Sequence, residues 1–402
     1  MNLETLFTRP TPIRLFTSLI GRETVHRVAG EFSHLRTIIL TGSLARGEGT
    51  FVESHGQCDF LGDAEFLLVF HRGARLPGKP QIDAVRHDIE RSLAQGGLAV
   101  EIGLSAVTDR YLRALERDIF TYELRYCGQV LWGDEGALSL IPDFPPCDIR
   151  LEDAWRLLEN RIIELLAATP DVAEMHGNLP RSLRYRVVKL YLDMATSLLV
   201  FAGAYKPTYR ERTTTLRLFS TALSTAVFWP FPLHPFAERV EACCLYKLCA
   251  QVSGPAGWEL WRHALEDARV LLRWELERLT QSATEATDET LWQTWLEMHP
   301  ARTRLRGWLH AARKQAWTRG ARRWPRWIRL ASESSPRHLV YRAANELLHA
   351  LPQIMAGEHG ATFDFQTRLP LPAATAEESH DWRARAAAIA RNYCLFVKET
   401  RS

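Results

Sequence analysis

The sequence has no cysteine pattern typical of a disulfide framework or a zinc site. It contains seven cysteines, an odd number, and no Cys-x-x-Cys pair. Its histidines are scattered without the spacing of metal ligands. We therefore expect most cysteines to be reduced and buried, which fits the cytoplasm.

The sequence also lacks a secretory leader and a long apolar segment. The first ten residues contain an acid and no apolar core, so we expect no signal peptide. The longest uncharged run, residues 218–237, contains three prolines between residues 230 and 235. Because prolines interrupt helices, this run predicts a buried helix and a proline-rich loop rather than a transmembrane segment.

Neither sign of charge is in excess. The chain has 50 Lys and Arg against 47 Asp and Glu, a net charge of +3, so its total charge does not require a polyanionic partner. A hydrophobic content of 46% with 24% charged residues is typical of a globular protein. A length of 402 residues exceeds one ordinary core, which predicts two or three domains.

The first third of the chain predicts a small α+β domain. Two kinds of periodicity alternate there, and they indicate helices and strands in turn. The expected helices are residues 11–30, 81–95 and 109–126. The expected strands are residues 37–40, 64–70, 98–107 and 129–132. Residues 44–62 hold four glycines and little periodicity, so we expect a long loop there, with Glu48 and Asp59 in solvent.

Three prolines between residues 142 and 146 mark the predicted domain boundary. We therefore assign residues 1–147 to the first domain, a small mixed sheet with flanking helices. Residues 148–402 show apolar residues at helical spacing and predict a mainly α-helical region. This region forms one bundle, or two sub-bundles that divide near residues 281–300.

Three acids in the first domain have the pattern of a metal site. Asp63 and Glu65 are two residues apart in an expected strand, so both side chains point to the same face. Two carboxylates on one face repel each other unless a cation lies between them, and hard oxygen ligands suit magnesium. Glu101 lies in an apolar frame on the next strand, where a metal or a buried salt bridge to a helix arginine is its expected partner.

A Gly-Ser turn precedes these acids. Gly42 and Ser43 follow the first expected strand, and such a turn offers backbone N–H groups and a hydroxyl to phosphate oxygens. Arg46 adds a nearby donor, although it could equally be a solvated loop residue.

The turn, the acid-x-acid pair and the third acid resemble the signature of nucleotidyltransferase domains in the DNA polymerase β superfamily, over roughly residues 35–135. The resemblance implies that Gly42 and Ser43 hold a nucleoside triphosphate. It implies that Asp63 and Glu65 bind two Mg²⁺ ions, and that Glu101 binds the catalytic ion and acts as the general base. Two features depart from the pattern: Glu65 stands where Asp is usual, and the 44–62 loop is long.

The helical half resembles the domains that accompany antibiotic-type nucleotidyltransferases, in which a helix closes the site. The helix expected at 182–201 has a polar stripe that includes Lys189, Asp193 and Ser197. This stripe is a solvated face, or it lines the cleft, in which case Lys189 contacts the nucleotide. The Tyr209–Arg212 stretch reaches phosphate, or it is an ordinary basic loop.

Residues 301–332 contain ten basic residues and four tryptophans but no acid. This composition fits a nucleic-acid surface or a membrane-surface helix. The alternative is a basic helix whose tryptophans belong to the core.

The leading functional prediction is an enzyme of the EC 2.7.7 type. It would move a nucleoside monophosphate from a nucleoside triphosphate to a hydroxyl of a small molecule or protein and release pyrophosphate. The alternatives are transfer to RNA, using residues 301–332, and a catalytically silent domain that binds a nucleotide or a partner. The acceptor, the base preference and the oligomeric state are beyond what these patterns determine.

Overall fold

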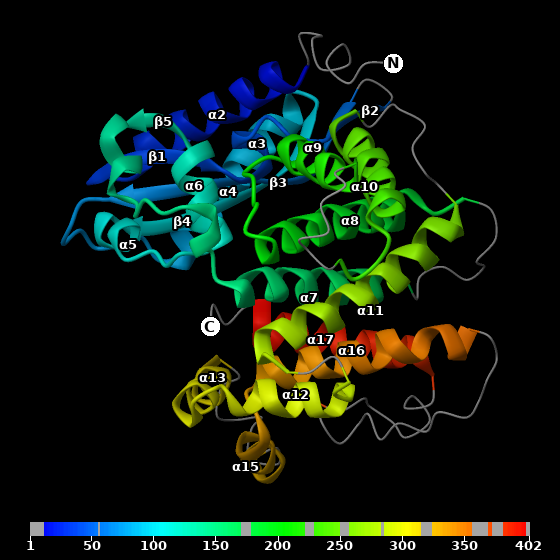
Figure 1. The fold of residues 1–402 in the computed structure, drawn as a ribbon. Helices are drawn as coiled ribbons and strands as arrows, with labels where there is room; N and C mark the ends of the chain where they lie inside the picture. The colour runs from blue at the N-terminus through cyan, green and yellow to red at the C-terminus, as the bar shows by residue number, and fades with distance from the viewer. Residues whose placement is uncertain are drawn as a thin grey trace. The chain divides into compact units, whose positions relative to one another are not determined.

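A computed structural model describes residues 12–54, 57–169, 178–221, 229–249, 257–282, 285–314, 324–355, 369–371 and 381–398 (Figure 1). The protein has mixed α and β structure, with one small sheet and many helices. The chain divides into two compact units. The first unit comprises residues 1–153, 202–218 and 241–254, and the second unit comprises the rest. Among the helices described, none is both long enough and apolar enough to cross a lipid bilayer.

The first unit contains the five strands. They are β1 (Leu35–Thr41), β2 (Phe51–Ser54), β3 (Gln57–Phe70), β4 (Leu98–Thr108) and β5 (Gln129–Gly133). Its helices are α2 (Pro12–Glu31), α3 (Gly42–Ala45), α4 (Lys79–Gln95), α5 (Asp109–Arg113), α6 (Ile119–Cys127) and the 3₁₀ segments η1 (Glu135–Leu140) and η2 (Pro146–Asp148). Strand β3 is central: β4 pairs with it in parallel, and β1 and β2 pair with it antiparallel.

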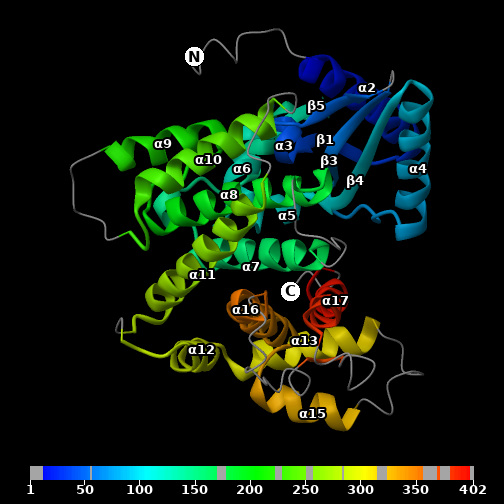
Figure 2. The ribbon, with the colours of Figure 1, turned by 90° about the vertical axis from the view of Figure 1, so that its right-hand side faces the viewer.

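The two faces of the sheet bury different side chains, because successive residues of a strand point to opposite faces. Ile38, Phe66 and Leu68 belong to the core on the side of α2 and α4. Helix α4 packs alongside β4 on this side (Figure 2). Leu67 and Val107 belong to the core on the other side, with α5, α6 and η1.

Two sequence-based predictions for this unit were wrong. The expected loop at 44–62 contains α3 and the antiparallel pair of β2 and β3. Buried Cys58 and Phe60 alternate with the half-buried Asp59, and this two-residue alternation is that of a strand. The acids and glycines of this stretch hid the alternation in the sequence. The expected helix at 109–126 is divided, because the side chain of Asp118 accepts a hydrogen bond from the Thr121 N–H and starts a new helix there.

The second unit is helical. It contains α8 (Arg181–Phe201), α11 (Trp258–Thr280), α12 (Asp288–Glu297), α13 (Ala301–Lys314), α15 (Trp324–Glu333), α16 (Pro336–Met355), α17 (Trp382–Tyr393), the short η5 (Cys394–Lys398) and nearly all of α7 (Leu151–Ala168). Helices α9 (Tyr209–Thr221) and α10 (Leu233–Leu248) contribute residues to both units. Trp155, Trp295 and Tyr341 pack together in its core, with ring centroids of Trp155 and Trp295 4.5 Å apart.

The polar stripe of α8 is not a solvated face along its whole length. Asp193 is buried and accepts a hydrogen bond from Arg161 Nε at 2.6 Å, and Ser197 is fully buried. The solvated interpretation was therefore wrong for the C-terminal half of the stripe, because helices of the second unit cover it. Lys189 is half-buried, with its Nζ 5.6 Å from the centroid of the Tyr185 ring.

Glu159 and Glu275 are fully buried among the described residues of the second unit. Glu159 Oε1 accepts a hydrogen bond from Asn345 Nδ2 at 2.5 Å, and burial raises the pKa of Glu159 well above its ordinary value. Burial also raises the pKa of Glu275 to about 8. The Glu275 carboxyl group therefore stays protonated in the folded protein at neutral pH, because its charged form would lose its hydration.

The raised pKa of Glu275 predicts a pH-dependent stability. Between pH 4.5, where the group ionises when unfolded, and about pH 8, where it ionises when folded, the folded state holds one extra proton. The free energy of unfolding therefore falls by about 1.4 kcal/mol per pH unit through this group as pH rises across that window. Denaturant unfolding of wild type and Glu275→Gln at several pH values measures the difference, which should grow in favour of the variant.

The matched control is Glu266→Gln, which removes an exposed carboxylate from the same helix. Its stability difference from wild type should not follow this pH course. A constant difference between wild type and Glu275→Gln from pH 5 to pH 8 would show that Glu275 does not gain a proton on folding.

Candidate active site

The three acids expected to bind metal lie on one face of the sheet. Asp63 of β3 stands opposite Glu101 of β4 in the parallel register, and Glu65 stands opposite Thr41 of β1 in the antiparallel one. Alternation along the strands puts Asp63, Glu65 and Glu101 on the same face as Leu67. Helices α5 and α6 cover that face only around Leu67 and its neighbours, so the three acids are exposed at its open end.

The surroundings of Asp63 and Glu101 exclude a buried salt bridge between Glu101 and a helix arginine. Glu101 is exposed, so the expected buried salt bridge was wrong: the apolar frame of its strand faces the other side of the sheet. Within the described ranges, no side chain forms a hydrogen bond or an ion pair with either acid. The oxygens of the three acids do not all lie within 4.8 Å of one another. Strand register sets their spacing, and a cation would lower the cost of bringing the carboxylates closer together.

The Gly42 turn lies directly over Glu65. Gly42 has a φ of +70°, and a Cβ atom on it would stand 2.5 Å from Glu65 Oε2. Only glycine fits both the left-handed backbone and this close approach. Ser43 follows at the start of α3, and its carbonyl accepts a hydrogen bond from the Glu48 N–H at 2.8 Å. The turn is therefore closed by its own backbone and holds Ser43 next to the carboxylate end of the site.

The side chain of Arg46 is buried and binds carboxylates of the first unit. Its side chain is only 5% exposed, and it donates hydrogen bonds to Glu123 and, from Nε at 3.1 Å, to Glu48. Glu48 is itself buried and accepts a hydrogen bond from the Arg210 N–H at 3.3 Å. The expectation that Glu48 is solvated was wrong, because the guanidinium of Arg46 neutralises it. A phosphate contact by Arg46 stays a prediction, and the structure shows its donors facing carboxylates.

Glu123 joins three parts of the first unit. It accepts hydrogen bonds from Arg46, from Arg212 and from the Tyr205 hydroxyl, the last at 2.7 Å. Burial would raise the pKa of Glu123, but the two guanidinium groups and Tyr205 hold it below its ordinary value. Arg212 is buried, so neither the phosphate-reaching nor the exposed-loop interpretation fits it. No local sequence pattern indicates this cluster, because Arg46 and Arg212 lie 77 and 89 residues from Glu123 in the chain.

Lys189, the remaining expected nucleotide ligand, lies on α8 in the second unit. Its contact with nucleotide stays a prediction.

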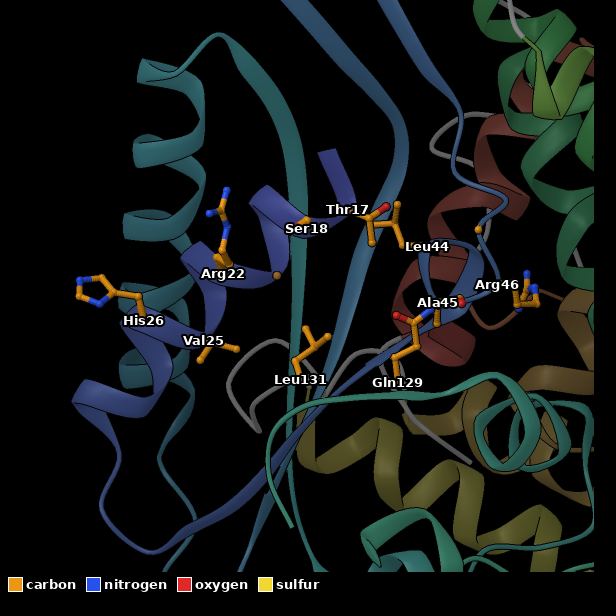
Figure 3. A pocket seen from close by; sticks show the side chains of 12 residues that line it. Thr17, Ser18, Arg22, Val25, His26, Leu44, Ala45, Arg46, Gln129 and Leu131 are labelled. Atoms are coloured by element: carbon orange, nitrogen blue, oxygen red, sulfur yellow. Dashed lines mark hydrogen bonds between the residues drawn. The ribbon is translucent and has the colours of Figure 1, made fainter. Parts of the chain in front are cut away.

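A cavity of about 850 Å³ opens in the first unit between α2, the α3 turn and β5 (Figure 3). Its walls include Thr17 and Val25 of α2, Ala45 of α3, and Gln129 and Leu131 of β5. Gln129 Nε2 donates a hydrogen bond to the Ala45 carbonyl at 2.5 Å and fixes the wall. None of the residues that line it is an acid, so this cavity is separate from the carboxylates. Its size and mixed lining suit a small organic molecule.

The approach of Gly42 to Glu65 predicts a specific effect of Gly42→Ala. The new Cβ displaces the flexible Glu65 carboxylate, so, with Glu65 as the expected Mg²⁺ ligand, Mg²⁺ affinity should fall at least tenfold in a titration followed by calorimetry. Unfolding should become easier by about 1 to 2 kcal/mol, because alanine resists a positive φ.

Gly47→Ala is the matched control, since Gly47 has a φ of +68° and a Cβ there would meet nothing within 4 Å. It should lose the same stability without losing Mg²⁺ affinity. Equal Mg²⁺ affinities of Gly42→Ala and Gly47→Ala would show that Gly42 does not contribute to the metal site.

The Glu123 cluster predicts a stability effect. Glu123→Gln leaves the guanidinium groups of Arg46 and Arg212 without their shared counter-charge, and breaking a buried pair in this way costs about 3 kcal/mol. Chemical denaturation measures the loss. Glu116→Gln, which removes an exposed partner of Arg150, should cost less than about 1 kcal/mol. A loss for Glu123→Gln no larger than that of the control would show that the cluster does not stabilise the unit.

The chain was compared with known protein families and with curated proteins. No family model matches it, and no curated protein matches it. The geometry of the site therefore carries the functional argument.

Proposed function

We propose that the protein is a metal-dependent nucleotidyltransferase of the DNA polymerase β type. It transfers a nucleoside monophosphate from a nucleoside triphosphate to a hydroxyl of a small molecule or protein. The observation that carries this proposal is the pairing of Asp63 with Glu101 across parallel strands, with Glu65 on the same open face below the Gly42 turn. The order of turn, acid pair and third acid is that of the superfamily signature.

The donor set fits magnesium. Asp63, Glu65 and Glu101 supply hard carboxylate oxygens, and two of them have no competing partner among the side chains that the structure describes. Asp63 and Glu65 would hold two ions, and Glu101 would hold the one nearer the acceptor. When bound, such ions neutralise the triphosphate and lower the pKa of the acceptor hydroxyl.

The protein residues would then position the reaction. The Gly42 backbone and the Ser43 hydroxyl orient the triphosphate, and Glu101 accepts the proton of the acceptor hydroxyl. The acceptor oxygen forms a bond to the α-phosphorus, while the bond from that phosphorus to the bridging oxygen breaks and pyrophosphate leaves. Positioning and charge neutralisation supply most of the catalysis in such transfers.

A catalytically silent fold that only binds nucleotide is the main alternative. Asp63 and Glu101 are exposed, and their carboxylates form no hydrogen bond or ion pair within the described residues, which supports a metal-bound site with turnover over a face used only for structure. Magnesium-dependent release of pyrophosphate distinguishes the two.

The test is Glu101→Gln, assayed with each of the four nucleoside triphosphates and magnesium. Wild type should release pyrophosphate, and the variant should release it at least a hundredfold more slowly, because general-base catalysis contributes roughly 10²- to 10⁴-fold. The variant should still be stabilised by magnesium nucleotide in a thermal melt, through Asp63, Glu65 and Ser43.

Asp88→Asn is the control, because Asp88 is an exposed carboxylate on α4, the helix that covers the opposite face. It should keep wild-type turnover. Full turnover in Glu101→Gln would remove Glu101 from the catalytic set. Binding of nucleotide by wild type without any pyrophosphate release, for all four bases and a panel of hydroxyl acceptors, would favour the silent fold.

A further inference from the structure

Helices α13 and α15 form a small subassembly in the second unit. Trp308 of α13 and Trp327 of α15 are buried, with ring centroids 5.7 Å apart. Trp308 Nε1 donates a hydrogen bond to the Ser334 carbonyl at 2.8 Å, and Trp327 Nε1 donates to the Pro370 carbonyl at 3.1 Å. The core interpretation of these two tryptophans is confirmed. Trp317 and the side chain of Trp324 lie outside the described residues.

The outer face of α13 alternates arginine and leucine. Its exposed residues lie at helical spacing along one stripe, which we call the Arg-Leu face: Arg302, Leu305, Arg306, Leu309 and Arg313. Leu305 is 57% exposed and Leu309 is 51% exposed. On α15, Ile328 is 66% exposed. Large aliphatic side chains are therefore in solvent beside cations, although the same helices bury their tryptophans.

The charge of the Arg-Leu face is not compensated. No acid occurs between residues 301 and 332. Arg302, Arg306 and Arg313 form no ion pair with any acid in the described part of the chain. The face thus combines an open positive charge with exposed apolar surface, a pairing that marks a binding surface rather than a solvated one.

Such a face suits two polyanionic partners, single-stranded nucleic acid and an anionic lipid bilayer. The exposed side chains distinguish between these partners. Proteins bind single-stranded nucleic acid by stacking bases on exposed aromatic rings. Among the described residues of α13 and α15, Trp308 and Trp327 are buried, and the exposed large apolar residues are Leu305, Leu309 and Ile328, which offer no stacking surface. Aliphatic side chains flanked by arginines are instead typical of helices that lie in the headgroup region of an anionic bilayer.

We propose that the Arg-Leu face of α13 docks on an anionic lipid surface, with Leu305 and Leu309 inserted and Arg302, Arg306 and Arg313 on the headgroups. This proposal does not depend on the proposed transferase activity, and its test needs no turnover.

The experiment is sedimentation of the full chain with vesicles at physiological salt. Phosphatidylcholine vesicles are compared with vesicles in which about one third of the lipid is phosphatidylglycerol. Anionic vesicles should bind the wild type at least tenfold more tightly. The double variant Leu305→Ser with Leu309→Ser, and separately Arg302→Gln with Arg306→Gln, should each weaken this binding at least tenfold.

Leu218→Ser is the matched control, because Leu218 is a 64% exposed leucine next to an arginine on α9. It should leave binding unchanged, and circular dichroism should show all variants folded. Equal binding of both vesicle types, or no binding to either, would overturn the proposal. Salt-sensitive binding of single-stranded RNA that the arginine variant loses and the leucine variant keeps would overturn it in favour of nucleic acid.

Discussion

The carboxylate of Glu123 accepts hydrogen bonds from two buried guanidinium groups, and the architecture of the first unit depends on it. Arg46 comes from the turn that carries Ser43, Glu123 comes from α6, and Arg212 comes from α9, far along the chain. Burying two arginines would be prohibitive without counter-charges, and Glu123 and Glu48 supply them. The cluster therefore fixes the Gly-Ser turn against α6 and ties residues 202–218 to the sheet.

This constraint explains how the open end of the sheet can remain exposed. The Gly42 turn lies over Glu65, and Asp63, Glu65 and Glu101 are exposed on β3 and β4. Backbone pairing of β1, β3 and β4 fixes their spacing, and the buried cluster fixes the turn from behind. Rigid support of a few exposed polar groups is what a site for phosphate and metal requires.

The second unit differs from the first in the surroundings of its buried carboxyl groups and of its exposed arginines. Glu159 and Glu275 are buried with no cationic partner among the described residues, and burial raises the pKa of both groups. Its arginines at α13 are instead turned outward, beside leucines. Buried charge in the first unit is thus held in ion pairs, the second unit combines ion pairs such as Arg161–Asp193 with buried carboxyl groups of raised pKa, and the arginines of the Arg-Leu face on α13 have no acid beside them in the described residues.

Local sequence determined the elements of the first third and the order of its site residues. The periods of β1, β3, β4 and α4 were readable because each depends on neighbours two to four residues away. The alternation of Asp63 and Glu65 likewise fixed their common face. Tertiary structure alone decided that Asp63 pairs with Glu101, that Glu101 is exposed, and that Arg46 turns inward to Glu123. These outcomes depend on strand register and on ion pairs between residues far apart in the chain, which no local pattern encodes.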